Sequence, residues 1–269
     1  MNTSVKPVAV KPIVVKIGGS TLGDSDTSFE DIVALQREGH IPVVVHGGGP
    51  VIDQWMQKQG LVPRFIKGLR VTDAPSLEIV VAVLAGLINK QLVATISALG
   101  GKVVGLSGAD GAILQARIAD PDLGLVGEIV SVDPGPVLDI LNAGYIPLLA
   151  PVGLDSGNSG QDRGKLLNIN GDTVAGHLAW ALDADKLVFL TDVDGVLDSS
   201  RRLISRMTVR EARGLIASGT ADGGMIPKLE ACIKALERVT VARIVNGRSA
   251  HALLNAVDGH DGTWLTRSG

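Results

Sequence analysis

Two glycine-rich turns, each directly after a short apolar run, are the features of this chain most suited to chemistry. The turns are Gly18-Gly19, after residues 13–17, and Gly47-Gly48-Gly49, after residues 41–45. Consecutive glycines let backbone N–H groups approach an anion closely, and a helix that follows adds its positive N-terminal end. The two turns, with Lys16 at the rim of the first, together predict a site that holds phosphate.

Two lysines could place a positive charge on a phosphoryl group. Lys16 lies near the end of the apolar run 13–17, and Lys228 directly follows the segment Gly-Gly-Met-Ile-Pro, which is expected to form a loop. A compact ammonium group suits a phosphoryl group in transfer. The alternatives are that Lys16 is a solvated residue at the end of a strand and that Lys228 is a solvated residue on a helix.

An arginine, two amides and an acid are further candidates. The guanidinium fork of Arg70 could bind a carboxylate, although an ion pair with Asp73 is the alternative. Asn168 ends an apolar run, so it could face a cleft. Asp172 could order two nearby lysines or bind a metal, whereas Asn170 is expected to cap the helix that follows.

The segment 191–197 follows the apolar run 186–190 and predicts a nucleotide site. Open α/β sheets bind ligands in loops at the carboxyl ends of their strands. The chain has no GxxxxGK[ST] motif and no protein-kinase signature, which argues against those two classes. His46 has no HxH or HxxxH partner, so we expect it to hold its turn by a hydrogen bond. Cys232 lies in a helical context and is expected to be a buried structural thiol.

Composition favours one large α/β domain or two small lobes. The chain has 269 residues, 45% of them hydrophobic and 20% charged, and its net charge is −3. No long basic stretch exists, so nucleic acid is not an expected partner. The N-terminus lacks the features of a secretory signal, and no run is judged long enough for a membrane helix. These observations predict a soluble cytoplasmic protein.

Strand and helix patterns alternate along the chain, which predicts a mostly parallel sheet covered on both faces. The expected strands are 12–17, 41–45, 102–106, 145–149, 186–191 and 241–245. The expected helices are 27–39, 50–59, 75–99, 134–143, 170–183, 208–218, 224–239 and 249–256. Helix stops are expected at Gly39, Gly60, Gly100 and Gly144.

Three segments need separate interpretation. The helix 75–99 carries an apolar stripe wider than one core face requires, so it is either fully buried or also packs against a twin subunit. Segments 61–71 and 113–132 contain short apolar runs with breaks, which is consistent with hairpins. Residues 153–164 are rich in Gly, Ser and Asp and predict a polar loop without an assigned role.

Six motifs in this order resemble the amino acid kinase family, over about residues 12–266. They are Lys16–Gly19, His46–Gly49, Gly68–Asp73, Asn168–Asp172, Leu190–Val196 and Gly223–Lys228. The third and fourth motifs resemble the branch that acts on N-acetyl-L-glutamate. The resemblance implies phosphorylation of the side-chain carboxylate of that substrate by ATP and Mg²⁺, in arginine synthesis.

The resemblance also implies an α/β fold, an open three-layer αβα sandwich with a central, mostly parallel sheet. The expected division is a flexible tail at 1–11 and a single domain at 12–269. In that domain, an N-lobe of about 12–168 binds the amino-acid substrate. A C-lobe of about 169–269 binds ATP.

Site roles are carried over by position from the family. Lys16 and Lys228 are expected to stabilise the phosphoryl group in transfer, and Asp172 to orient both lysines. The predicted substrate-binding residues are Gly47, Gly48, Arg70 and Asn168. The predicted nucleotide-binding residues are Gly18, Gly19, Asp192, Val193, Asp194, Gly195, Val196, Leu197, Gly223, Gly224 and Met225. No protein metal ligand is expected.

Hexameric members of the family that arginine inhibits carry an extra N-terminal helix. Only about eleven residues precede the first expected strand here, without an amphipathic pattern. We therefore expect a homodimer through helix 75–99 that arginine does not inhibit. Two other functions stay open: a kinase for carrier-protein-bound aminoadipate in lysine synthesis, and a non-catalytic nucleotide or partner sensor.

Overall fold

The computed structural model of the chain describes residues 10–18, 27–66, 68–157 and 164–268. Its main sheet is formed by β1 (Ile13–Ile17), β2 (Pro42–His46), β5 (Val103–Ser107), β8 (Ile146–Ala150), β11 (Lys186–Thr191), β12 (Arg206–Thr208), β13 (Val241–Asn246) and β14 (Thr263–Thr266). The helices are α1 (Ser28–Arg37), α2 (Gly49–Lys58), α3 (Ala74–Val81), η1 (Ala82–Ile88), α4 (Asn89–Ala98), α5 (Gly135–Asn142), α6 (Gly171–Ala181), α7 (Val209–Ala217), α8 (Met225–Ala235) and α9 (Ala252–Asp258).

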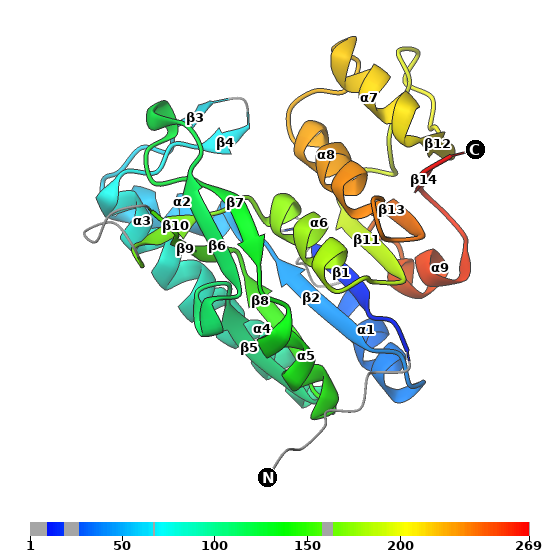
Figure 1. Cartoon of the computed structure of the whole chain (residues 1–269), viewed down its shortest axis with the longest axis horizontal. Coiled ribbons are helices and arrows are strands. Elements are labelled where there is room, and N and C mark those ends of the chain that lie inside the picture. The colour runs from blue at the N-terminus through cyan, green and yellow to red at the C-terminus, as the bar shows by residue number, and fades with distance from the viewer. Residues whose placement is uncertain (1–9, 19–26, 67, 158–163, 269) are drawn as a thin grey trace.

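The eight strands of the main sheet run in the order β12-β14-β13-β11-β1-β2-β8-β5. Neighbouring strands are parallel except for β13 and β14. Helices cover both faces of this sheet, with α6 and α8 on one face and α1 and α9 on the other (Figure 1). The predicted α/β fold, a three-layer αβα sandwich with a mostly parallel sheet, is therefore confirmed.

The central strands are buried on both faces, as their unbroken apolar runs predict. Val14 and Val43 belong to the core cluster that includes α6 and α8. Their neighbours Val15 and Val44 belong to the opposite cluster, which includes α1 and α9. This arrangement gives the carboxyl ends of β1, β2 and β11 a rigid support at one edge of the sheet.

A second sheet lies beside the carboxyl ends of the main strands. It has four strands in the order β10 (Leu166–Asn168), β9 (Val152–Asp155), β6 (Leu114–Ile118) and β7 (Gly127–Val132). A separate hairpin joins β3 (Phe65–Ile66) to β4 (Leu69–Arg70). The hairpins expected within 61–71 and 113–132 are thus present, whereas β9, β10, β12 and β14 were not predicted. The prediction of a polar loop at 153–164 was wrong for residues 153–155, which belong to β9. Residues 158–163 of that prediction lie outside the described residues.

The predicted helix 75–99 is one continuous helix over 74–98, made of α3, η1 and α4. Its middle part, η1, is π-helical. The helix has 25 residues and a hydropathy of 2.0 over its most apolar window, so by length and composition alone it could cross a membrane. The prediction that no segment reaches this length was wrong. Buried core helices pass the same test, and this one packs against α1, β5 and β8.

Candidate active site

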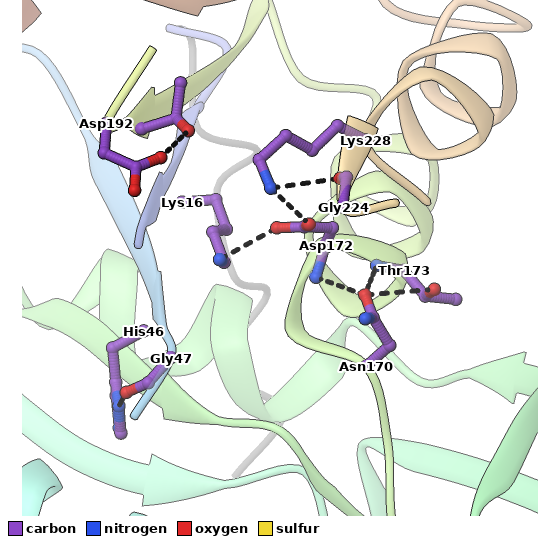
Figure 2. Close-up of polar contacts among 10 residues, drawn as sticks. Lys16, His46, Gly47, Asn170, Asp172, Thr173, Asp192, Gly224 and Lys228 are labelled. Carbon is purple, nitrogen blue, oxygen red and sulfur yellow. Dashed lines mark hydrogen bonds and ion pairs between the residues drawn. The ribbon is translucent and has the colours of Figure 1, made fainter. Parts of the chain in front are cut away.

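Three charged side chains from three elements meet at the centre of the molecule (Figure 2). Lys16 comes from β1, Asp172 from the first turn of α6, and Lys228 from α8. The Lys16 Nζ lies 2.8 Å from Asp172 Oδ1, and the Lys228 Nζ lies 3.0 Å from Asp172 Oδ2. Lys16 is 8% exposed and Asp172 is 5% exposed. The structure therefore excludes the solvated alternatives for both lysines and brings them together on one carboxylate.

The start of α6 fixes Asp172 in this position. The Oδ1 atom of Asn170 accepts hydrogen bonds from the backbone N–H groups of Asp172, at 2.9 Å, and Thr173, at 3.1 Å. Asn170 is therefore the helix cap that the sequence predicts. Because the cap sets where the helix begins, it also sets which residue of the first turn faces the two lysines.

The charges at this centre favour an anionic ligand. Burial opposes ionisation of Asp172, but the charges of Lys16 and Lys228 outweigh it and hold the pKa of its carboxyl below the usual range. Two ammonium groups and one carboxylate leave one net positive charge. A phosphoryl group that approached the two lysines would meet that charge in a largely water-excluded place, where electrostatic stabilisation is strong.

The glycine turns lie beside the two lysines, but their amides differ from expectation. The N–H of Gly47 donates to the carbonyl of Ile17 at 3.0 Å, and the N–H of Gly18 donates to the carbonyl of Leu190 at 3.0 Å. Both amides continue the sheet ladders, so the prediction that the Gly47 N–H points at an anion is wrong. The N–H groups of Gly48 and Gly49 have no partner within the described part of the chain. Gly19 lies outside the described residues.

A cavity of about 170 Å³ opens on the Lys16 side of the centre. Gly47, Gly48, Arg70 and Asn168 line it, as does Gly49, which the site prediction omitted. Arg70 is 9% exposed, so it is not a surface residue.

The contacts of Arg70 rule out the alternative that it forms an ion pair with Asp73. Its Nη1 donates to Oδ1 of Asp53 at 2.6 Å, and its guanidinium lies over the ring of Phe65. Asp73 instead caps α3 by accepting from the N–H of Ser76. Arg70 is thus held rigidly at the wall of the cavity, with a partner on α2 that no local sequence signal marks.

Asn168 is also held in place at the wall of this cavity. Its Nδ2 donates to Oγ1 of Thr72 at 3.0 Å, and that hydroxyl donates to the carbonyl of Arg70 at 2.9 Å. The amide oxygen of Asn168 is then left as an acceptor for a ligand. The cavity therefore offers a cationic fork and a neutral amide on walls that are linked by one hydroxyl.

A larger cavity of about 560 Å³ opens on the Lys228 side. Seven predicted nucleotide-site residues line it: Asp192, Val193, Gly195, Val196, Leu197, Gly224 and Met225. It is also lined by residues that the prediction missed: Thr191, Asp198, Arg201, Thr220, Ala221 and Asp222.

Three described residues predicted for the nucleotide site, Gly18, Asp194 and Gly223, do not line this cavity. Asp194 accepts a hydrogen bond from the Nδ2 of Asn246 at 2.8 Å, which ties the 192–198 turn to β13. Gly223 lies next to the hairpin that carries Gly68, since a Cβ at Gly68 would stand 3.6 Å from the Gly223 carbonyl oxygen. The second contact joins the rims of the two cavities.

Neither a metal-binding cluster nor a reactive thiol is found among the described residues. Within residues 10–18, 27–66, 68–157 and 164–268, no cluster of three or more His, Cys, Asp or Glu side chains could hold a metal ion. Cys232 is buried on α8, and burial raises the pKa of its thiol strongly. The thiol is therefore inert, as the sequence predicts.

Comparisons with known proteins agree with this geometry. The sequence profile described as "Amino acid kinase family" matches residues 11–246. Acetylglutamate kinase of Acaryochloris marina is 43% identical, over 97% of this chain and 94% of that protein. Acetylglutamate kinase of Gloeobacter violaceus is 46% identical, over 93% of this chain and 84% of that protein. The structure of smu.665 from Streptococcus mutans UA159 has a TM-score of 0.81 and 29% identity, over 95% of this chain and 98% of that one.

Proposed function

The chain belongs to the amino acid kinase family, and we propose that it transfers the γ-phosphoryl group of ATP to the side-chain carboxylate of N-acetyl-L-glutamate. The product is N-acetyl-L-glutamyl 5-phosphate, an intermediate of arginine biosynthesis. One observation carries the proposal: Lys16 and Lys228 meet on Asp172 between two cavities of unequal size. The named relatives supply the identity of the acceptor substrate.

The reaction needs little acid–base chemistry from the protein. The attacking carboxylate has an ordinary pKa of about 4 and is ionised at pH 7, so no general base is required. What remains is in-line alignment and neutralisation of charge on the phosphoryl group. The buried Lys16, the half-buried Lys228 and free backbone N–H groups supply both.

Each residue of the centre has a role in this proposal. Lys16 and Lys228 stabilise the phosphoryl group from two sides, and Asp172 holds both ammonium groups in place. The N–H groups of Gly48 and Gly49 donate to the phosphoryl oxygens, since the Gly47 N–H is committed to Ile17. Gly47 contributes the shape of the turn.

The smaller cavity is the proposed site for N-acetyl-L-glutamate. The guanidinium of Arg70 binds the α-carboxylate, because a rigid fork matches the two oxygens of a carboxylate. Asn168 binds the acetamido group through its amide oxygen. These assignments leave the side-chain carboxylate near Gly48, where the phosphoryl group arrives.

The larger cavity is the proposed site for ATP, and its volume suits a nucleotide better than a small amino acid. The turn 192–197 and residues Gly224 and Met225 contact the nucleotide, and Gly18 and Gly223 support these loops. Mg²⁺ usually binds through phosphates, waters and one or two carboxylates, so a cage of protein ligands is not needed. Mg²⁺ bound there would neutralise charge on the phosphates. Asp192 and Asp222 line the cavity and would supply one or two carboxylates, whereas both oxygens of Asp172 face lysines and those of Asp198 accept from Ser200 and Arg202.

We place the enzyme in the cytoplasm as a homodimer formed through the helix 74–98. One face of this helix is open at Ala82 and Gly86, which are exposed, and is flanked by Val81, Ala85 and Val93, which are half-buried at the edge of the core. A cationic side chain on that face, in Gly86→Arg, should convert a dimer into a monomer in light scattering. A dimer that persists unchanged in this variant would contradict the assigned interface.

An ATP-dependent hydroxamate assay tests the proposed reaction. The panel contains N-acetyl-L-glutamate, glutamate, aspartate, N-acetylaspartate and carbamate, with Lys16→Ala as the catalytic control. The expected result is turnover of N-acetyl-L-glutamate alone, lost in the variant. Absence of turnover in a protein that still binds Mg-ATP would favour an acceptor linked to a carrier protein, and unchanged biological activity of Lys228→Ala would favour a non-catalytic sensor.

A further inference from the structure

His46, which precedes the second glycine turn, is fully buried and makes one hydrogen bond with each ring nitrogen. Its Nδ1 lies 3.0 Å from the carbonyl oxygen of Gly47, and its Nε2 lies 3.2 Å from the Nδ2 of Asn89. Burial lowers the pKa of His46 to about 4, the bond with Gly47 opposes that shift, and the charges of Lys16 and Lys90 add to it. The ring is therefore neutral at pH 7 and carries a single N–H.

The orientation of the Asn89 side chain is fixed by groups that can act in only one way. The ammonium of Lys90, which only donates, lies 2.9 Å from the Oδ1 of Asn89. The carbonyl oxygens of Leu148 and Leu106, which only accept, lie 3.0 and 3.3 Å from its Nδ2. The atom that faces His46 is consequently the amide nitrogen, which shares its two hydrogens among the His46 Nε2 and the two carbonyls and offers no acceptor to an Nε2–H.

This donor determines the tautomer of His46. Because Asn89 donates to Nε2, the ring proton resides on Nδ1, where it donates to the carbonyl of Gly47. In a trans peptide the C=O and the following N–H point in opposite directions. Holding the Gly47 carbonyl toward the ring therefore turns the Gly48 N–H away from it, on the side where Gly48 lines the smaller cavity.

The long helix is shaped to deliver Asn89 to this position. Asn89 follows directly after the π-helical segment η1, and wide turns of this type occur often at functional sites. A Cβ at Gly48 would collide with the side chains of Leu84 and Ile88, so the helix packs directly on the turn. A Cβ at Gly105 would collide with the Asn89 amide. Gly48 thus makes room for the helix, and Gly105 makes room for the buried amide of Asn89.

We propose that Asn89 is a positioning residue for phosphoryl transfer, which acts through His46 to aim the Gly48 N–H at the phosphoryl group. The inference rests on the proposed function, because it concerns a donor to the group in transfer. Asn89 touches neither substrate in this account. Its effect should therefore appear in kcat rather than in the KM of either substrate.

The variant Asn89→Asp tests the tautomer directly. A carboxylate at this position, paired with Lys90, accepts a hydrogen bond from Nε2–H, so a neutral ring would face the Gly47 carbonyl with a lone pair. Because the new oxygen also faces the Leu148 and Leu106 carbonyls, the melting temperature is measured beside kcat. The carboxylate also raises the pKa of His46, and the imidazolium that forms at lower pH regains its Nδ1–H. We expect kcat at pH 8.5 to fall by about 10²-fold and to recover as the pH falls toward 6. A pH profile of kcat with the wild-type shape and magnitude would overturn the proposal.

A matched pair of substitutions at His46 provides a second test. The amide of Asn reaches the position of Nδ1, whereas the amide of Gln reaches that of Nε2. His46→Asn should keep most of kcat, and His46→Gln should lose it, with melting temperatures and ATP affinity compared to verify folding. Equal losses of kcat in the two variants would contradict the inference. Asn142→Asp, at the exposed end of α5, is the control that should change neither kcat nor its pH profile.

Nitrogen-15 NMR of the wild-type imidazoles separates this inference from the proposed function. The His46 signals, identified by their loss in His46→Asn, should report a protonated Nδ1 and an unprotonated Nε2. A protonated Nε2 would overturn the inference even if N-acetyl-L-glutamate is turned over. If wild-type protein does not turn over N-acetyl-L-glutamate, the proposed function fails and the catalytic role of Asn89 fails with it, whatever the tautomer.

Discussion

The two cavities that flank Asp172 are built in different ways. The smaller one depends on charged and polar side chains that are held by partners on other elements, as Arg70 is held by Asp53 and Asn168 by Thr72. The larger one is bounded mainly by the turns 192–198 and 220–224, and some of its apolar side chains are exposed. Side-chain identity should therefore matter most in the smaller cavity, and backbone shape in the larger one.

The largest effect should come from the lysines that separate the two cavities. Lys16→Ala or Lys228→Ala removes one ammonium from the phosphoryl group, at a cost of about 3–4 kcal/mol in the barrier, or 10²–10³-fold in kcat. Steady-state kinetics with both substrates measures this loss. Lys11→Ala, which removes an exposed pair with Asp183, should leave kcat unchanged. A kcat loss below tenfold in both active-site variants would mean that Lys16 and Lys228 do not stabilise the phosphoryl group in transfer.

The stability of the fold around His46, next to the glycine turn of the smaller cavity, should also depend on pH. The pKa of His46 in the folded protein, about 4, lies below the ordinary value of 6.5, so the unfolded chain takes up a proton first as the pH falls. The associated stability is present above pH 6.5 and is lost as the pH falls toward 4. Between pH 7.5 and 4.5, it should amount to about 2–3 kcal/mol of unfolding free energy. Denaturant titrations of wild type and His46→Asn at both pH values measure it, and parallel pH slopes would contradict it.

Arg70→Lys should weaken binding of the amino-acid substrate in the smaller cavity. Lysine keeps the charge but loses the fork, so a bond of about 1.5–3 kcal/mol to the carboxylate is weakened and the KM for N-acetyl-L-glutamate should rise about 10–100-fold. The KM for ATP should stay within about threefold. Arg117→Lys, on an exposed arginine that pairs with Glu128, is the matched control. An equal rise in both KM values would mean that Arg70 does not serve the smaller cavity alone.

Gly195→Ala probes the backbone of the larger cavity and should have the smallest effect of this series. Gly195 has a φ of +148°, and an added Cβ would lie 2.5 Å from Oγ1 of Thr263 and 2.8 Å from Leu203. We expect a loss of about 1–3 kcal/mol in stability and a higher KM for ATP, with an unchanged KM for N-acetyl-L-glutamate. Gly214→Ala on α7, where a Cβ meets open space, is the control and should not destabilise the fold. If Gly195→Ala changed neither stability nor the KM for ATP, backbone shape would not be what determines binding in the larger cavity.

The sequence predicted the elements with strong local signals. The apolar runs that became β1, β2 and β11 were placed to within a residue or so, and the glycines expected to stop helices at 39, 60, 100 and 144 all have positive φ. The strands β9, β10, β12 and β14 were missed because they are short and owe their form to distant partners. Propensity carries little information on such pairings.

The site residues divide along the same line. Lys16, Asp172 and Lys228 could be proposed because each sits in a motif, and their meeting point required only the fold. Asp53 and Asn89 carry no local mark, since their roles depend on Arg70 and His46, which are far away in the chain. The hydrogen bond from the Gly47 N–H to Ile17 could not be predicted either, because it depends on how far the pairing of β1 with β2 extends.

A crystal structure with N-acetyl-L-glutamate and a non-hydrolysable ATP analogue is the most direct test of the central claim. We expect the amino acid in the smaller cavity with a carboxylate on Arg70, and the nucleotide in the larger cavity. The γ-phosphoryl group should lie between Lys16 and Lys228, within hydrogen-bond distance of the Gly48 N–H. A γ-phosphoryl group remote from both lysines, or N-acetyl-L-glutamate bound outside the smaller cavity, would contradict it.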